Sequence, residues 1–103
     1  MESMNAEQFR AAVSAPTPTL IDFYAPWCVH CRRIAPALEA LAAKHAQALR
    51  IGQVNIDTEP LLAQEAGIEV IPTLVLYRDG KALSSITAPE SKAALDAFLQ
   101  PYL

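Results

Sequence analysis

The sequence is poor in cysteine, in basic charge and in long apolar runs. Its 103 residues include two cysteines, too few for the disulfide framework on which small secreted domains depend. The net charge is −3 and charged residues make up 18% of the chain, which excludes a disordered composition and a basic nucleic-acid-binding domain. No apolar stretch approaches the ~18 residues of a membrane span. We therefore expect neither a nucleic-acid partner nor a membrane partner.

The chain also lacks internal repeats, low-complexity tracts and Gly/Ser linkers. Its 103 residues are 52% hydrophobic, which is enough for one core and leaves no room for a second. We expect residues 1–103 to form a single domain, with a monomer as the default state. The start, MESMNAEQF, has no basic head followed by an apolar stretch, which favours a cytoplasmic protein. A periplasmic location is the alternative if a leader has been removed.

The first half of the chain shows patterns typical of strands and helices in alternation. A capping-box pattern at residues 5–8 predicts a first helix that ends near Ser14. The runs TLIDFYA (19–25) and LRIGQVNI (49–56) are dense in β-branched and apolar residues, as in strands that are covered on both faces. Between them, apolar residues at helical spacing predict a long helix through residues 34–45.

The second half of the chain adds a short helix, a hairpin and a final helix. Residues 61–66 suit the short helix, and strands 73–78 and 81–87 flank Asp79-Gly80, the strongest kind of two-residue turn signal. The final helix is expected to hold Pro89 in its first turn. Strands separated by helices imply parallel pairing, and the hairpin adds an antiparallel strand. The sequence predicts an α/β three-layer sandwich, with a mixed four-stranded central sheet flanked by helices.

The segment Cys28-Val29-His30-Cys31 carries the chemistry. It follows the first predicted strand directly and opens the longest predicted helix. Unpaired backbone N–H groups and the helix dipole favour an anion at a helix N-terminus, so a thiolate there is stabilised. Two cysteines three residues apart on a helical turn can also close a disulfide with little backbone movement. The spacing therefore indicates a redox-active dithiol.

Five motifs occur in the order and at the spacings of one known family: FYAPWCVHC, RRIAP, VNID, VIPTL and YRDGK. Over residues 20–99 the chain therefore resembles the thioredoxin superfamily, which implies a thioredoxin-like fold and a thiol–disulfide oxidoreductase acting on protein disulfides. FYAPW and His30 are more similar to the catalytic domains of protein disulfide isomerase. A disulfide oxidase or isomerase is therefore one alternative, and a redox-inert interaction module with the same fold is another.

The resemblance implies a catalytic role for three residues. Cys28 would attack a substrate disulfide as a thiolate, and Cys31 would resolve the mixed disulfide. Asp22 matches the family's buried acid; desolvation within so apolar a strand would raise its pKa, which suits a base that takes the proton of Cys31. We also expect the imidazole of His30 beside Cys28 to stabilise the thiolate. That would move the reduction potential from about −270 mV, the value of a thioredoxin, to about −200 mV.

The resemblance also implies a substrate-binding role for three residues. Pro72 matches a proline that follows a cis peptide bond, which would let the backbone of Ile71 pair with an extended substrate segment. Trp27 would supply apolar surface beside the site. Two positions depart from the family: Gln53 stands where a lysine is usual, and Ala88 where a glycine usually lines the substrate groove. The family's first strand is not evident in the sequence.

The resemblance further implies the partners. These are disulfide-containing client proteins and, as electron donor, a thioredoxin reductase. No bound cofactor is needed, because the dithiol itself carries two electrons. A zinc site is the other common use of this cysteine spacing, but His30 and His45 are the chain's only histidines, too few to complete a set of converging soft ligands. We therefore expect no metal.

Overall fold

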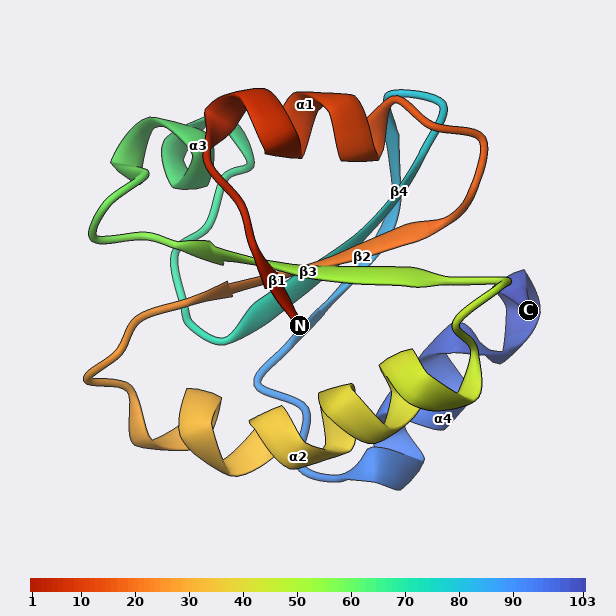
Figure 1. Cartoon of the computed structure of the whole chain (residues 1–103). Helices are drawn as coiled ribbons and strands as arrows, with labels where there is room; N and C mark the ends of the chain where they lie inside the picture. Colours follow the sequence, from red (N-terminus) through yellow and green to blue (C-terminus); the bar gives the residue numbers. More distant parts are fainter.

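The computed structural model describes residues 1–103 and arranges them in three layers (Figure 1). Two helices cover one face of a central sheet: α1 (Ala6–Val13) and α3 (Pro60–Glu65). Two others cover the opposite face: α2 (Val29–Lys44) and α4 (Lys92–Leu99). A 3₁₀ helix over Gln100–Tyr102 follows α4. The predicted α/β sandwich is confirmed, and no helix is both long and apolar enough to traverse a bilayer.

The sheet is mixed, and its strand order places β2 at the centre. From one edge to the other the order is β1-β3-β2-β4-β5. Strands β1, β3 and β2 are parallel, β4 is antiparallel to β2, and β5 is antiparallel to β4. The bounds are β1 (Glu2–Ser3), β2 (Thr19–Tyr24), β3 (Arg50–Asn55), β4 (Thr73–Arg78) and β5 (Lys81–Thr87).

The predicted four-stranded sheet is wrong by one strand, because the sequence pattern does not reveal β1. This two-residue strand pairs with β3, and its continuation is fixed by a hydrogen bond of 2.8 Å from the Met4 N–H to the Gln53 carbonyl. The Met4 side chain is buried over Gly52, where an added Cβ would lie 2.5 Å from the Met4 Cε. Two residues are too few to show an alternating pattern, so tertiary contacts define this strand.

Side-chain caps fix where the helices begin. At α1, Asn5 Oδ1 accepts a hydrogen bond from the Gln8 N–H and Gln8 Oε1 accepts one from the Asn5 N–H, both at 2.9 Å, which is the predicted capping box. At α4, Ser91 Oγ accepts a bond from the Ala94 N–H at 3.1 Å. The expected placement of Pro89 in the first turn of α4 is wrong, because Ser91 caps the helix and leaves Pro89 in the preceding turn.

The two faces of the sheet carry separate parts of the core, because successive side chains of a strand point to opposite faces. On the side of α1 and α3 the buried residues are Met4, Phe9, Ala12, Val13, Ile21, Phe23, Val54, Leu62, Ala63, Val75 and Tyr77. On the side of α2 and α4 they are Leu20, Ile34, Leu38, Leu41, Leu49, Ile51, Leu74, Leu76, Leu95 and Leu99. Asp22 alternates with Ile21 and Phe23, so this acid belongs to the α2 side.

Ala88, directly after β5, has a φ of 48°. This left-handed conformation costs a residue with a Cβ about 1–2 kcal/mol, whereas the greater freedom of glycine in the unfolded chain costs about 0.4–1 kcal/mol. We expect Ala88→Gly to raise the free energy of unfolding by about 0.5–1 kcal/mol in urea titrations. Ala82→Gly, within β5 and without a positive φ, should lower it. Equal losses in both variants would contradict the assigned strain.

Candidate redox site

Cys28 lies at the point where the chain leaves β2 and enters α2. It is the N-cap residue of α2, and its Sγ accepts a hydrogen bond of 3.1 Å from the Cys31 N–H. Its carbonyl accepts the Arg32 N–H at 3.2 Å and so starts the helical ladder. A negative charge on this sulfur therefore meets a backbone donor and the positive end of the helix dipole. The predicted placement of the cysteine motif at a helix N-terminus is confirmed.

Cys28 and Cys31 form a disulfide, with their Cα atoms 5.2 Å apart. That separation is within the ordinary range for a disulfide, and the helical turn supplies it. Both residues are largely buried, Cys28 at 7% exposed and Cys31 at 4%, so Cys28 is the more accessible by a small margin. The pair can hold and release two electrons while one sulfur stays within reach of a partner.

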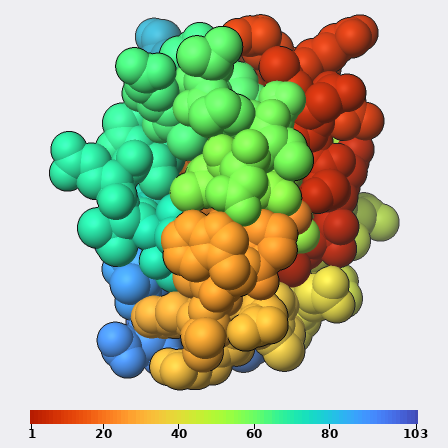
Figure 2. All heavy atoms as spheres, turned by 90° about the vertical axis from the view of Figure 1, so that its left-hand side faces the viewer, coloured from red at the N-terminus to blue at the C-terminus, as the bar shows by residue number.

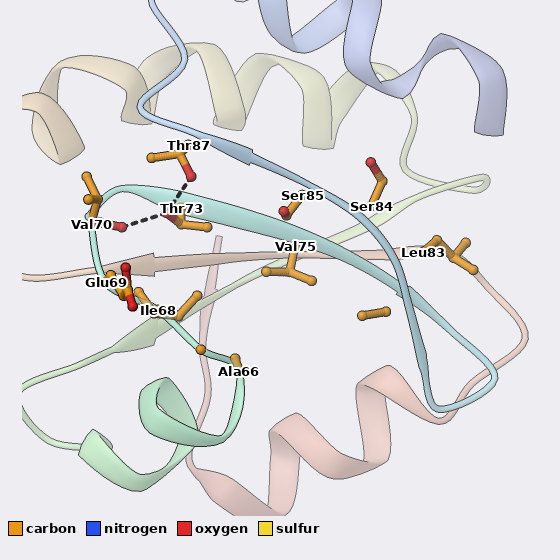
Figure 3. A pocket seen from close by; sticks show the side chains of 12 residues that line it. Ala66, Ile68, Glu69, Val70, Thr73, Val75, Leu83, Ser84, Ser85 and Thr87 are labelled. Carbon is orange, nitrogen blue, oxygen red and sulfur yellow. Dashed lines mark hydrogen bonds between the residues drawn. The ribbon is translucent and has the colours of Figure 1, made fainter.

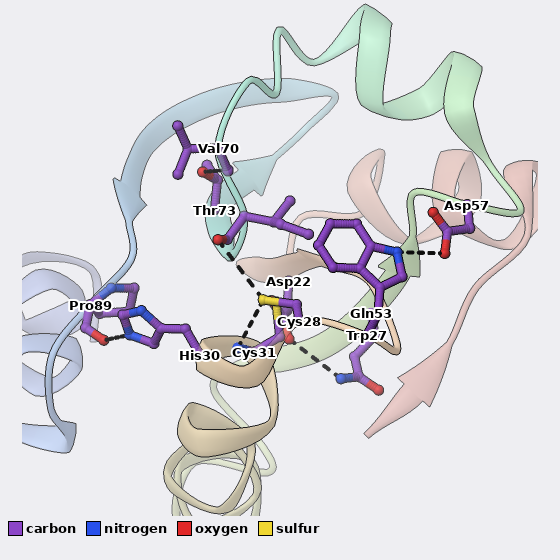
Figure 4. Close-up of a disulfide and its surroundings, with 11 residues drawn as sticks. Asp22, Trp27, Cys28, His30, Cys31, Gln53, Asp57, Val70, Thr73 and Pro89 are labelled. Atoms are coloured by element: carbon purple, nitrogen blue, oxygen red, sulfur yellow. Dashed lines mark hydrogen bonds between the residues drawn. A yellow bond between two sulfur atoms is a disulfide. The ribbon is translucent and has the colours of Figure 1, made fainter.

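The rim around Cys28 comes from segments far apart in the sequence (Figures 2 and 4). Figure 2 shows the segment after β2, in orange, bordered by the segment after β3 in green and the segment after β5 in blue. Ile71 contributes its carbonyl oxygen, 4.0 Å from Cys28 Sγ, and the Ile71–Pro72 peptide bond is cis, as the resemblance implied. The structure thus brings Ile71 and Pro72 to the disulfide from a sequence distance of more than forty residues.

Trp27 forms one side of this rim. Its side chain is 64% exposed, and its Nε1–H donates to Asp57 Oδ2 at 3.0 Å (Figure 4). Val29 and Val70 are also more than half exposed, which is unusual for large apolar residues. Sequence reasoning missed Asp57, Val29 and Val70. Asp57 had a usable signal, since it follows β3 at the same sheet edge at which β2 leads to Cys28.

His30 lies on the opposite side of Cys28 from Trp27 (Figure 4). Its Nε2 is 2.9 Å from the carbonyl oxygen of Pro89. A carbonyl only accepts, so Nε2 carries the hydrogen. Cys28 Sγ accepts a hydrogen bond from the Cys31 N–H and lies 4.0 Å from the Ile71 carbonyl oxygen, and no hydrogen bond joins it to this imidazole. The tuning of the reduction potential by His30 therefore stays a prediction. Pro89 was missed because a backbone acceptor leaves no mark in the sequence.

Asp22 is the one carboxylate buried within the sheet. It is fully buried, its Oδ2 accepts a hydrogen bond of 3.3 Å from Gln53 Nε2, and its Oδ1 has no partner. Gln53 stands directly opposite on β3. Burial raises the pKa of Asp22 from 3.8 to about 6, and the hydrogen bond from Gln53 lowers it in part. The expected upward direction is confirmed, and a group with this pKa can take up and give back a proton near neutral pH.

A groove of about 470 Å³ lies over β4 and β5, and Val70, part of the rim around Cys28, also lines it (Figure 3). Its lining is mostly small or apolar, and Glu69 is its only charged residue. No group of three or more His, Cys, Asp or Glu side chains converges anywhere in the chain in a way that could hold a metal ion. Both cysteines of the chain lie at the N-terminus of α2.

Comparison with known proteins finds a thioredoxin family model and several thioredoxins that are similar to this chain. The family model for thioredoxin matches residues 1–101. The thioredoxin of Alicyclobacillus acidocaldarius is 36% identical over 95 residues, which cover 92% of this chain and 90% of that protein. The thioredoxin of Porphyra purpurea is 34% identical over 86 residues, 84% of this chain and 80% of that protein. A bifunctional thioredoxin reductase/thioredoxin of Mycobacterium leprae is 35% identical over 95 residues, 92% of this chain and 21% of that protein.

The buried acid makes stability depend on pH. Because its pKa in the folded chain, about 6, is above 3.8, the stability of the folded state is fully present below about pH 4 and falls as pH rises through about 6. Ionisation of Asp22 therefore makes the free energy of unfolding about 3 kcal/mol lower at pH 8 than below about pH 4. We expect Asp22→Asn to raise the free energy of unfolding of the oxidised protein by about 2–3 kcal/mol at pH 8, and by far less at pH 4.

Urea unfolding at the two pH values measures this difference. Asp79→Asn serves as the matched control, because Asp79 is exposed in the hairpin turn and should show no such pH-dependent gain. A gain of equal size at pH 4 and pH 8 for Asp22→Asn would show that the effect is one of packing and not of ionisation.

Proposed function

The chain belongs to the thioredoxin family and is a thiol–disulfide oxidoreductase, and we propose that its Cys28–Cys31 pair reduces disulfides of client proteins. One observation carries the proposal. Cys28 Sγ accepts the backbone N–H of Cys31 at the N-terminus of α2, while exposed apolar side chains and an open backbone edge surround it. The sulfur is thus both stabilised as an anion and accessible to another polypeptide.

The proposed exchange has two steps. The Cys28 thiolate attacks one sulfur of a client disulfide; that S–S bond breaks, and the second client sulfur leaves as a thiolate that takes up a proton. Cys31, deprotonated, then attacks Cys28 Sγ, which closes the intramolecular disulfide and releases the first client sulfur, which is protonated in turn. Two electrons and two protons pass from the dithiol to the client, and the chain ends in the disulfide form.

Asp22 is the proposed acceptor for the proton of Cys31. It lies on the α2 side of the sheet, and its unpartnered Oδ1 leaves a lone pair free in a desolvated environment. A pKa of about 6 keeps the carboxylate ionised for most molecules at neutral pH, and the proton can return to solvent or product after the exchange. Gln53 holds the carboxylate in place without adding charge.

Ile71 is the proposed docking edge for the client backbone. Neither its N–H nor its carbonyl pairs with another backbone group, although its carbonyl oxygen lies 4.0 Å from Cys28 Sγ. An extended client segment that brings its cysteine to Cys28 would lie alongside this free edge and pair with it as an added strand does. Trp27 and Val70 would cover apolar side chains on either side of the client cysteine.

The proposed source of electrons is a thioredoxin reductase. Support comes from the relative in Mycobacterium leprae, whose name states that both activities reside in one protein. A reductase of this class would reach the same disulfide through the same rim. This assignment makes the chain a reductant; the oxidase or isomerase alternative requires the opposite direction of electron flow.

Trapping tests the roles of the two cysteines. With Cys31→Ser the first step should proceed and the second should stop, so mixed disulfides with client proteins should accumulate through Cys28. Non-reducing electrophoresis followed by mass spectrometry measures them. Cys28→Ser is the matched control and should trap few or none. Equal yields from the two variants would contradict the proposed attack by Cys28. No trapped client with either variant would favour the redox-inert module.

Coupled turnover tests the direction. With NADPH, a bacterial thioredoxin reductase and insulin, the unsubstituted chain should sustain NADPH oxidation, and Cys28→Ser should reduce the rate at least about 100-fold, to background, because the nucleophile is lost. The absorbance of NADPH follows the reaction. If the chain reduces insulin with dithiothreitol but consumes no NADPH, the proposed donor is wrong. Efficient oxidation of a reduced, unfolded protein in its place would favour the oxidase or isomerase.

A further inference from the structure

We propose that His30 is a positioning residue for client proteins: its imidazole pins the turn between β5 and α4 against α2, and so sets the opening through which a client reaches Cys28. This turn comprises residues 88–91 and is called the client-side turn below. The expected effect on client binding rests on the proposed function. The contacts by which His30 holds the turn in place do not depend on that function.

The contact of His30 with the client-side turn is specific. His30 lies in the first turn of α2, is partly buried, and its Nε2 is 2.9 Å from the Pro89 carbonyl. Pro89 is buried, and its carbonyl accepts no backbone N–H. The imidazole N–H therefore satisfies an acceptor that has no backbone partner.

A second contact ties the client-side turn to the segment at Pro72. The Ala88 N–H donates to the Pro72 carbonyl at 2.7 Å, and Ile71, one residue earlier, faces Cys28 Sγ. The contacts form a ring: from Cys28 along α2 to His30, across to Pro89 and Ala88, across to Pro72, and back through Ile71. The client-side turn is thus held at two adjacent residues by two different elements.

The client-side turn needs such tethers because its backbone is strained. Ala88 has a φ of 48°, a conformation that a residue with a Cβ leaves when it is released. The bond from His30 and the bond to Pro72 oppose this relaxation. With the His30 bond removed, the Ala88–Pro72 bond would be the remaining hydrogen bond between the turn and the segments that border the sulfur.

The position of the client-side turn makes it one wall of the approach to Cys28. Figure 4 shows the disulfide between Trp27 on one side and His30 with Pro89 on the other. A polypeptide that pairs with Ile71 must pass between these walls, whereas a small disulfide needs only the sulfur itself. Loss of the tether should therefore weaken the binding of protein clients and leave the reaction with a small disulfide unchanged.

Two variants at one position separate this role from others. His30→Leu removes the donor and keeps apolar bulk, and His30→Gln keeps an N–H donor that can reach the same carbonyl. With insulin as protein disulfide and dithiothreitol as recycling reductant, we expect His30→Leu to raise KM about 3- to 10-fold with kcat within about twofold, the size of one lost hydrogen bond. His30→Gln should restore KM to within about twofold. Neither variant keeps the imidazole beside Cys28, so any change in the rate with the small disulfide DTNB should be the same in both variants.

Three results would overturn the inference: an unchanged KM in His30→Leu, no rescue by His30→Gln, or a DTNB rate that differs between the two variants by the same factor as the KM for insulin, which would place the action of His30 on the sulfurs. Amide hydrogen exchange over residues 86–92 gives a readout that needs no activity. The Ala88 amide should exchange faster in His30→Leu and return toward the unsubstituted rate in His30→Gln. Failure of the unsubstituted chain to reduce insulin would refute the proposed function, while the exchange data would still decide whether His30 pins the turn.

Discussion

The redox chemistry proposed for this molecule depends on one hydrogen bond, from the backbone N–H of Cys31 to the sulfur of Cys28. Helix α2 needs an acceptor for the unpaired N–H groups of its first turn, and here a sulfur fills the position that a hydroxyl or carboxylate oxygen usually takes. The same contact that caps the helix stabilises a negative charge on the sulfur. The central strand β2 leads directly to this point, so the middle of the sheet determines where Cys28 Sγ lies.

The burial of Asp22 beside this site destabilises the fold when the acid is ionised. The carboxyl group of Asp22 lies in an apolar strand, β2, and has no contact with solvent. Its one hydrogen-bond donor is the neutral amide of Gln53. An uncharged donor supports the ionised acid less than a cation would, so desolvation dominates and the pKa stays high. Apolar packing on both faces of the sheet outweighs this cost, and it leaves beside the disulfide a carboxyl group whose pKa is about 6.

The sequence was informative where a signal is local. The capping box at Asn5, the Asp79-Gly80 turn and the cysteine pair at the start of a helix all depend on neighbouring residues, and the structure has each of them where the sequence places it. Features that depend on residues far apart in the chain were harder to predict from the sequence. Strand β1 is too short for a pattern, and the Pro89 carbonyl that binds His30 is a backbone atom with no residue signature. Ile71 and Pro72 were found only through the family resemblance, because nothing local joins them to Cys28.

The central claim is that the amino end of α2 stabilises a thiolate at Cys28. The most direct measurement is the rate of alkylation of the reduced protein by iodoacetamide at pH 7, with the modified residue identified by mass spectrometry. We expect Cys28 to react about threefold faster than free cysteine, since its higher thiolate fraction outweighs the lower nucleophilicity of a low-pKa thiolate, and Cys31 to react far more slowly. A rate at Cys28 no greater than that of free cysteine, or preferential modification of Cys31, would contradict the account.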